Sequence, residues 1–389
     1  MCPKEERLRQ EAIKRYLAGE SAKNVCTVLG RSERWFFKWL ERYRTSKADW
    51  YRDHPHGPRV AANRIDAVTE QLICSLRKQL EEHQEFCGAQ AIWWELEDLD
   101  WPVLPTLMTI NRILKRNDLI APRPKRYQPK GKVYPKIPAT VLNQLHQLDL
   151  MGPRYLTGPV RFYLANVMDI YSHRVAINPM PGRSSTGVLE ALVSTWQRLG
   201  MPKYLQMDNQ LPFRGSNRYP RSFGKIIRLC LELGIQPVFI PLREPWRNAE
   251  VEKFQDTCQF RFLRKVTMES FSTLLTESQR FENLHNNRYR YSVTKGKTPL
   301  QVMAASTHTL RLLPGDFQIP DLKEKPTKGR IHLVRFIRSN RILDIFSEKF
   351  KISEQLVYEY VWSTICVKEQ KLRVFLNGNQ MQEFKYQLR

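Results

Sequence analysis

Three acidic residues stand where their side chains could hold divalent metal ions. Asp149 lies in the middle of HQLDLMG, between Leu148 and Leu150, where an unpaired buried carboxylate would cost several kcal/mol of desolvation. Asp208 ends the run KYLQMD, and Glu252 lies in WRNAEVEKF. Carboxylates that converge without a cationic partner require a divalent cation, and oxygen-only ligands suit Mg²⁺ or Mn²⁺.

Each of the three carboxylates also has an ordinary structural explanation. Taken alone, Asp149 could be a turn residue at a strand end, Asp208 a helix N-cap and Glu252 one of several surface acids on a charged helix. The ordered triplet with its flanking residues favours a shared site.

Three other acidic residues compete with the triplet as metal ligands. We expect Asp169 to hydrogen-bond within a hairpin, because the residues after it form a turn. Glu250 and Asp256 bracket Glu252, and Asp256 shares its helix face one turn along. His146, three residues before Asp149, is expected to be a core histidine.

An α/β core must position these residues. Three β-rich runs between residues 142 and 180 predict an antiparallel meander, followed by a helix over 184–199, a strand over 203–208, a helix over 223–233 and a strand over 235–241. A last helix is expected from near Trp246 to beyond Phe260. This order predicts a mixed sheet over residues 141–303, with Asp208 at a strand tip beside the first strand and Glu252 in the first turns of the last helix.

The first 50 residues have the pattern of a helix-turn-helix domain. Apolar residues recur at helical spacing in three short segments, which Gly19 and Gly30 interrupt. Ser21 and Ser32 stand where N-caps are expected, so the recognition helix should run over residues 32–43.

A second helical module is predicted over residues 60–120. It comprises helices over 64–82 and 88–96 and a helix that Thr106 could cap. It is typical of a second helix-turn-helix or a winged helix, although a three-helix bundle that binds protein remains open. Residues 121–140, rich in Pro and Lys, predict an extended basic linker that either follows a phosphate backbone or serves as a spacer.

Five short strands predict a small β-barrel over residues 325–389. Its basic residues would bind DNA or another subunit; they are Lys328, Arg330, Arg335 and Arg338.

The charge balance narrows the class of partner. The chain has 63 Lys and Arg against 39 Asp and Glu, which gives a net charge of +24 and favours a polyanionic partner, nucleic acid first. No apolar run is long enough to span a bilayer, and the N-terminus lacks the apolar core of a signal peptide, so we expect an intracellular protein without a membrane partner. The seven cysteines show no CxxC pair and predict neither a zinc site nor a disulfide framework.

The segments HQLDL, QMDNQ with Phe213, and WRNAEVEKF resemble the three signatures of the DDE superfamily, which contains retroviral integrases and insertion-sequence transposases. The resemblance includes VMDIYSHRV and NLHNNRYRYSVTKGKTPLQVM and spans about residues 142–303. Asp208 and Glu252 are separated by 43 residues. Gln210 and Ala249 stand where the family usually has glycine. The zinc-binding His-His-Cys-Cys module of retroviral integrases has no counterpart here, so the N-terminal helices resemble those of bacterial insertion sequences.

This resemblance implies a multidomain α/β protein whose ribonuclease H-like core is the catalytic domain. Asp149 would bridge two Mg²⁺ or Mn²⁺ ions, and Asp208 and Glu252 would each complete one. The implied activity is 3′-end cleavage and strand transfer on double-stranded DNA, with terminal inverted repeats and target DNA as substrates. Joining two ends implies a dimer or tetramer on DNA, in the bacterial cytoplasm at the nucleoid.

Basic residues on the helices and the linker are the candidate DNA contacts. They are Arg31, Arg34, Lys38, Arg42, Arg112, Lys115, Arg116, Arg123, Lys125, Arg126, Lys253, Arg261 and Arg264. One alternative is a non-catalytic descendant of a transposase that binds DNA or has a regulatory role. A plain ribonuclease H-like nuclease is the other, although it would not obviously need two recognition modules.

Overall fold

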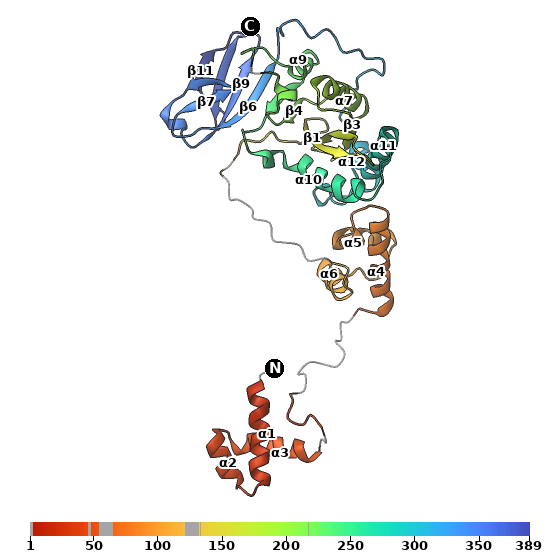
Figure 1. Cartoon of the computed structure of the whole chain (residues 1–389), viewed down its shortest axis with the longest axis vertical. Coiled ribbons are helices and arrows are strands. Elements are labelled where there is room, and N and C mark those ends of the chain that lie inside the picture. Colours follow the sequence, from red (N-terminus) through yellow and green to blue (C-terminus); the bar gives the residue numbers. More distant parts are fainter. Residues whose placement is uncertain (1–2, 46–47, 54–64, 121–131, 133, 217) are drawn as a thin grey trace. The chain divides into compact units, whose positions relative to one another are not determined.

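The computed structural model describes residues 3–45, 48–53, 65–120, 132, 134–216 and 218–389. The chain divides into two compact units, Met1–Thr69 and Glu70–Arg389 (Figure 1). None of the described helices combines the length and apolar composition that crossing a bilayer requires.

The first unit contains helices α1 (Pro3–Leu17), α2 (Ala22–Leu29) and α3 (Glu33–Thr45). The two predicted caps are present, since Ser21 Oγ accepts from the Asn24 amide at 3.3 Å and Ser32 Oγ accepts from the Trp35 amide at 3.2 Å. Gly30 ends α2 in the left-handed region at φ 61°, which glycine adopts without a Cβ penalty. Apolar side chains from all three helices form one core, so the predicted helix-turn-helix layout is confirmed.

The second helical module consists of α4 (Ala67–Glu82), α5 (Ala89–Asp98) and α6 (Leu107–Arg116). Thr106 caps α6 as predicted, accepting from the Thr109 amide at 3.2 Å. Residues 65–120 form helices and turns and no strand, so the described structure has no wing. Whether this module binds DNA stays a prediction.

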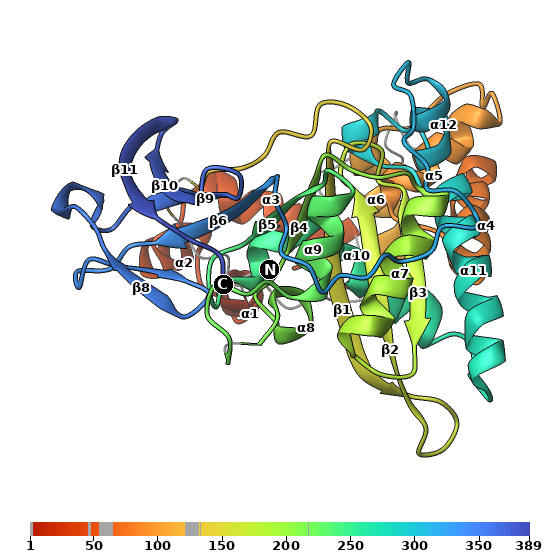
Figure 2. The same ribbon diagram turned by 90° about the horizontal axis from the view of Figure 1, so that it is seen from above.

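The core sheet has the predicted ribonuclease H-like order. Strands β1 (Leu145–Tyr155), β2 (Arg161–Asp169) and β3 (Val175–Met180) form an antiparallel meander. On the other side of β1, strands β4 (Tyr204–Met207) and β5 (Gln236–Phe239) run parallel to it. The order β5-β4-β1-β2-β3 therefore places the end of β4 directly beside β1 (Figure 2).

Helices cover both faces of this sheet. Helices α7 (Ser185–Arg198) and α9 (Lys225–Glu232) pack on one face. Helix α10 (Ala249–Thr257), a π-helical turn (Cys258–Leu263) and α11 (Phe271–Arg288) pack on the other. Shorter elements complete the core, namely α8 (Leu211–Arg214), α12 (Pro299–Ala304) and 3₁₀ turns at Pro245–Asn248 and Ser292–Thr294.

Helix α11 was not predicted, because its buried face is partly polar. Ser278, Glu282, His285 and Asn286 are buried along with the apolar residues. Two of them pair with the free edge of β3: Glu282 Oε2 accepts from the Ile177 amide at 2.8 Å and Asn286 Oδ1 accepts from the Val175 amide at 2.9 Å. The helix thus covers a sheet edge at the expense of the apolar periodicity that identifies helices in a sequence.

The C-terminal strands extend the core sheet instead of closing a separate barrel, which corrects the prediction. Strand β6 (Arg330–Phe336) runs parallel to β5 and continues the sheet through β9 (Tyr360–Cys366), β10 (Lys371–Leu376) and β11 (Asn379–Lys385). A hairpin of β7 (Ile342–Ile345) and β8 (Glu348–Lys351) packs against this extension, where Phe350 contacts Phe384 and Tyr386, and a 3₁₀ turn (Glu354–Leu356) precedes β9. The five strands predicted from the sequence, over 331–337, 342–346, 356–362, 364–368 and 371–377, omitted β8 and β11 and divided β9 in two.

Two glycines close the loop between α8 and α9. Gly215, at φ +93°, lies against Gly224, the N-cap of α9, and a Cβ on Gly224 would come within 2.7 Å of the Gly215 nitrogen. The Gly224 amide also donates to the Arg214 carbonyl at 3.2 Å. The close contact is between backbones, so no side-chain rotation can relieve it.

We expect Gly224→Ala to lower the free energy of unfolding by about 1–3 kcal/mol, because added volume at a tight contact forces the backbone apart. Gly88→Ala is the matched control, since Gly88 is also a helix N-cap with extended backbone but has no atom within 4 Å of the added Cβ. Urea denaturation of both variants measures the difference. An equal loss of unfolding free energy in the two variants would show that the backbones at Gly215 and Gly224 can separate at no cost.

Candidate active site

Strand pairing places Asp149 and Asp208 on one face of the sheet. Gln147 on β1 pairs with Gln206 on β4, and side chains two residues apart share a face. Asp149 therefore faces the same side as Asp208, which follows the last residue of β4. Both carboxylates are half-buried on the face that α10 covers.

Buried amides fix the start of α10 on that face and bring Glu252 to it. Asn248 donates through Nδ2 to the Leu148 carbonyl at 2.9 Å and accepts from Gln206 Nε2 at 3.2 Å. Gln147 Oε1 accepts from the Val251 amide at 3.2 Å. Glu252 thus lies in the first turn of α10 beside β1 and β4, as predicted.

The three carboxylates interact electrostatically. Burial, followed by the negative charges of Asp208 and Glu252, raises the pKa of Asp149 to about 7. Burial also raises the pKa of Asp208. The pKa of Glu252 is raised by burial, then by the charges of Asp256 and Asp208. Among the described residues, no Lys, Arg or His forms an ion pair with any of the three, so the site has uncompensated negative charge that a divalent cation would offset.

Two glutamines, which the sequence did not single out as functional, hold the aspartates. Gln255 Nε2 donates to Asp149 Oδ2 at 2.8 Å, and the Leu150 amide donates to Asp149 Oδ1 at 2.8 Å. Gln210 donates to Asp208 twice, from its backbone amide at 3.0 Å and from Nε2 at 2.7 Å. In this arrangement, no three acidic, His or Cys side chains of the described residues are gathered closely enough to chelate an ion. The oxygen donors suit Mg²⁺ chemically, because a carboxylate oxygen that accepts one hydrogen bond keeps a second lone pair for a metal ion.

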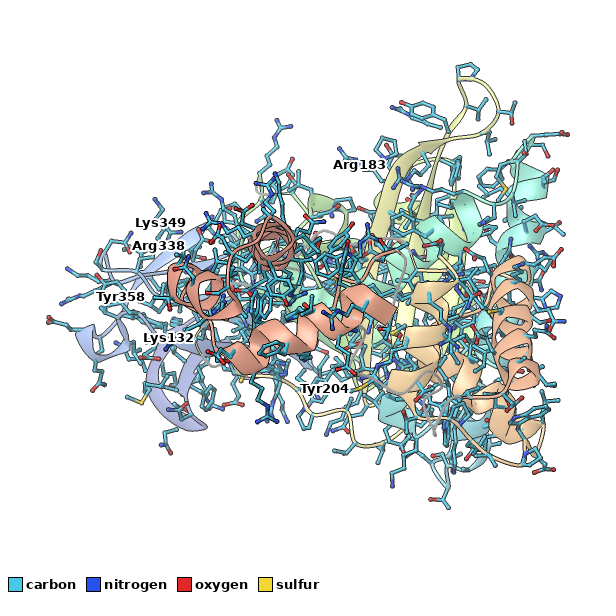
Figure 3. All side chains as sticks on the ribbon, turned by 90° about the horizontal axis from the view of Figure 1, so that it is seen from below. Lys132, Arg183, Tyr204, Arg338, Lys349 and Tyr358 are labelled. Atoms are coloured by element: carbon cyan, nitrogen blue, oxygen red, sulfur yellow. The ribbon has the colours of Figure 1, made fainter. Side chains whose placement is uncertain are left out.

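A buried arginine supports the loop after Asp208 and corrects one prediction. Arg335 was expected to bind DNA or another subunit, yet it is 4% exposed. The other three cations of that prediction, Lys328, Arg330 and Arg338, are exposed, and Figure 3 labels Arg338. Arg335 donates through Nη2 to Asn209 Oδ1 at 2.8 Å and through Nη1 to the Ile240 carbonyl at 3.0 Å. Asn209 donates to the same carbonyl at 2.7 Å. An isolated arginine in a strand gives no sequence signal for this role.

The competing ligands lie as expected. Asp169 accepts hydrogen bonds in its hairpin from the Ser172 amide at 3.0 Å and from the Asn143 amide at 3.1 Å. His146 is fully buried, and burial lowers its pKa to about 3, which keeps it a neutral core residue. Glu250 and Asp256 are exposed on α10, and Asp256 acts on the site through its charge on Glu252.

The candidate DNA contacts of the first unit lie on α3 or just before it. Arg34 and Lys38 are exposed on α3. Arg31 forms an ion pair with an acid of α1, and the Arg42 guanidinium lies 4.7 Å from the Trp39 ring centroid. Lys38 Nζ also lies 5.6 Å from the Trp39 ring centroid, so Arg34 is the freest of the four to reach a phosphate or a base.

The candidate contacts of the second unit divide in the same way. Arg112, Lys115, Lys253 and Arg264 are exposed. Three of the candidates have structural partners: Arg116 forms an ion pair with Glu70, Arg261 donates to Cys87 Sγ at 3.0 Å, and the Arg264 guanidinium lies 4.5 Å from the Phe260 ring centroid. The three linker cations fall outside the described residues; they are Arg123, Lys125 and Arg126.

Residues 3–49 match the family model of the homeodomain-like domain. The first unit is therefore a helix-turn-helix domain of a DNA-binding type. Together with the core topology, this match is consistent with the DDE transposase and integrase superfamily.

Two solved structures are similar to this chain at low sequence identity. The catalytic core domain of the integrase of HTLV-2, in a dimeric form with magnesium, is 16% identical, with 42% of this chain and 99% of that chain covered and a TM-score of 0.32. The intasome of simian T-cell lymphotropic virus with PP2A regulatory subunit B56 gamma is 15% identical, with 80% of this chain and 96% of that chain covered and a TM-score of 0.35.

The raised pKa of Asp149 predicts how metal-free stability depends on pH. In the unfolded chain an aspartate ionises near pH 3.9, whereas burial keeps Asp149 protonated up to about pH 7 in the folded protein. Between about pH 4 and about pH 7, Asp149 therefore carries a proton in the folded protein that it has lost in the unfolded chain. Because the folded state binds more protons over this range, the contribution of Asp149 to the free energy of unfolding falls as pH rises from about 4 to about 7.

We therefore expect Asp149→Asn to raise the free energy of unfolding in EDTA by on the order of 1–3 kcal/mol at about pH 8, and by less at about pH 5. Thermal melting at both pH values measures this, with Glu190→Gln, an exposed carboxylate on α7, as control. A variant that melts below the wild type at about pH 8 would contradict the assignment of an uncompensated charge to Asp149.

Proposed function

We propose that this chain is a DNA transposase or integrase of the DDE type, which binds the ends of a mobile element and catalyses metal-dependent 3′-end cleavage and strand transfer into target DNA. The observation that supports the proposal is the set of Asp149, Asp208 and Glu252 on one sheet face of a ribonuclease H-like core, without a cationic partner among the described residues. The homeodomain-like domain supports DNA as the substrate. Strand transfer joins two ends, so at least a dimer is the active form.

Asp149, Asp208 and Glu252 would hold Mg²⁺ or Mn²⁺, two ions in each active site. Bound there, the ions would supply an activated oxygen nucleophile and neutralise charge on the phosphate. The protein's contribution is the rigid placement of the carboxylates. The side-chain amide of Asn248 holds α10 against β1, and the guanidinium of Arg335 holds the loop after Asp208. Gln255 and Gln210 orient the aspartate carboxylates and would hold that orientation when the carboxylates bind a metal ion.

One observation favours a second candidate, a non-catalytic DNA-binding descendant. Glutamine amides contact both aspartates, and the described carboxylates are not gathered closely enough to chelate an ion. A plain nuclease fits less well, because a hydrolase without strand joining does not need a sequence-reading N-terminal domain. The two main candidates differ in one measurable property, which is chemistry on bound DNA.

The test is incubation of the purified chain with labelled linear DNA that carries the element's ends, in Mg²⁺, Mn²⁺ or EDTA. We expect 3′-end nicks and strand-transfer products that require metal and that fall by roughly 100-fold or more in Asp208→Asn, because one ligand is lost. Glu190→Gln serves as the control and should retain activity.

Electrophoretic mobility shifts on the same DNA separate binding from chemistry. End binding without products under either metal would favour the non-catalytic descendant. Products that persist in Asp208→Asn would show that another group, and not this triad, carries the reaction.

A further inference from the structure

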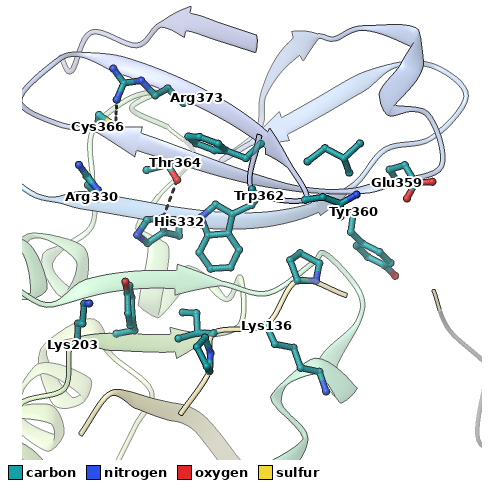
Figure 4. A pocket seen from close by; sticks show the side chains of 18 of the residues that line it. Lys136, Lys203, Arg330, His332, Glu359, Tyr360, Trp362, Thr364, Cys366 and Arg373 are labelled. Carbon is teal, nitrogen blue, oxygen red and sulfur yellow. Dashed lines mark hydrogen bonds between the residues drawn. The ribbon is translucent and has the colours of Figure 1, made fainter. Parts of the chain in front are cut away.

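A cavity of about 1000 Å³ lies on the sheet face that carries the carboxylates. Its aromatic lining includes Tyr204 of β4, Trp362 of β9 and Phe375 of β10, and residues 135–138 form another part of the wall. Figure 4 shows Trp362 and His332 pointing from the C-terminal strands toward the side that carries Lys136 and Lys203. We call this cavity the Trp362 groove.

Strand register shows that the groove and the active site share a face. Tyr204 pairs with Gln236, two residues before Val238, which pairs with His332. His332 in turn pairs with Thr364, two residues from Trp362. Since Tyr204 and Asp208 are four residues apart along one strand direction, they face the same side, and the groove continues the surface that holds the carboxylates.

The Trp362 ring is held in a fixed orientation. Its Nε1 donates to His332 Nδ1 at 3.1 Å, and His332 Nε2 lies 2.8 Å from Gln236 Oε1. With Nδ1 accepting, the histidine carries its proton on Nε2 and donates to Gln236. Burial lowers the pKa of His332 to about 4, so it stays neutral and the Trp362 ring keeps its partner at neutral pH. A half-buried indole held in this way offers a ready surface for stacking.

Cations without acidic partners surround the rings. Lys136, Lys203 and Arg330 line the groove, are exposed, and form no ion pair with any described residue. Glu359, the acidic residue of the groove lining, already forms an ion pair with Lys132 at 2.7 Å. Fixed aromatic faces with unpaired cations match the repeating bases and phosphates of a single strand, whereas duplex DNA keeps its bases stacked on one another.

We propose that the Trp362 groove binds an unpaired DNA strand, whose bases stack on Trp362 and whose phosphates contact Lys136, Lys203 and Arg330. The proposal deepens the proposed function and rests on it for the choice of DNA, because cleavage and strand transfer at an element end free a flanking strand beside the carboxylates. The groove also adjoins α10, since the Tyr360 hydroxyl in its wall accepts from Arg247 in the turn that begins that helix, at 3.0 Å.

The test measures binding in the full chain carrying Asp208→Asn, so that no reaction occurs. The probe is a labelled oligothymidylate of about 12 nucleotides, followed by fluorescence anisotropy, with a blunt duplex of equal length measured in parallel. We expect Trp362→Leu to weaken oligothymidylate binding about 10-fold, and Trp362→Phe, which keeps an aromatic ring, to weaken it less. Lys203→Ala should weaken it a few-fold and lower the salt dependence.

Lys349→Ala is the matched control, because Lys349 is an exposed lysine on β8 and does not line the groove (Figure 3). Its oligothymidylate binding should equal that of the background protein, and duplex binding should be unchanged in every variant. Photocrosslinking of an oligonucleotide with 5-iodouracil should label the peptide that contains Trp362.

Three outcomes would overturn the proposal. They are unchanged oligothymidylate binding in both Trp362→Leu and Lys203→Ala, an equal loss of duplex and single-strand binding, and crosslinks that map away from the groove. Lys203 is exposed, so its variant tests the proposal even if Trp362→Leu fails to fold. The assay contains no reaction step, so a negative result in the cleavage test leaves its outcome interpretable.

Discussion

The desolvation free energy of negatively charged carboxylates in a partly buried site is the constraint on which the second unit depends. Asp149 and Asp208 face the same side of neighbouring strands, and burial is the largest cause of the raised pKa at both. Nothing cationic among the described residues offsets this cost; neutral amides from Gln255 and Gln210 satisfy the oxygens instead. A neutral donor orients a carboxylate without removing its charge, so the attraction for an external cation is kept.

Polar side chains also assemble the layers around that site. Asn248, Gln147 and Gln206 fix the start of α10 on the sheet, and Glu282 and Asn286 of α11 pair with the edge of β3. Apolar packing alone would let a helix shift along the sheet, because many positions bury similar apolar area. A hydrogen bond between a side chain and a particular backbone group forms at only one of these positions. These contacts therefore determine where along β1 the first turn of α10 lies, and with it the position of Glu252.

Much of this arrangement could be predicted from the sequence, and the exceptions have physical reasons. The strands that carry Asp149 and Asp208 have regular apolar patterns, and the caps Ser21, Ser32 and Thr106 are local signals, so these elements were predicted well. Helix α11 was missed because its buried face is polar, and the role of Arg335 was mistaken because charge normally indicates exposure. The barrel was predicted from strand spacing, which contains no information on whether β6 pairs with β5 or only with its own neighbours.

The pairing of β6 with β5 has a consequence for how the chain can be divided. A hydrogen-bonded ladder runs from β3 to β11, and Arg335 on β6 binds the Ile240 carbonyl and Asn209 on the core side of that junction. Core and C-terminal strands should therefore melt in one cooperative transition, and a fragment ending before β6 would expose a sheet edge and leave the loop after Asp208 without its support. A domain appended on a flexible linker could be replaced without disturbing the core. The C-terminal strands of this protein cannot be replaced in that way, because they are part of the core sheet.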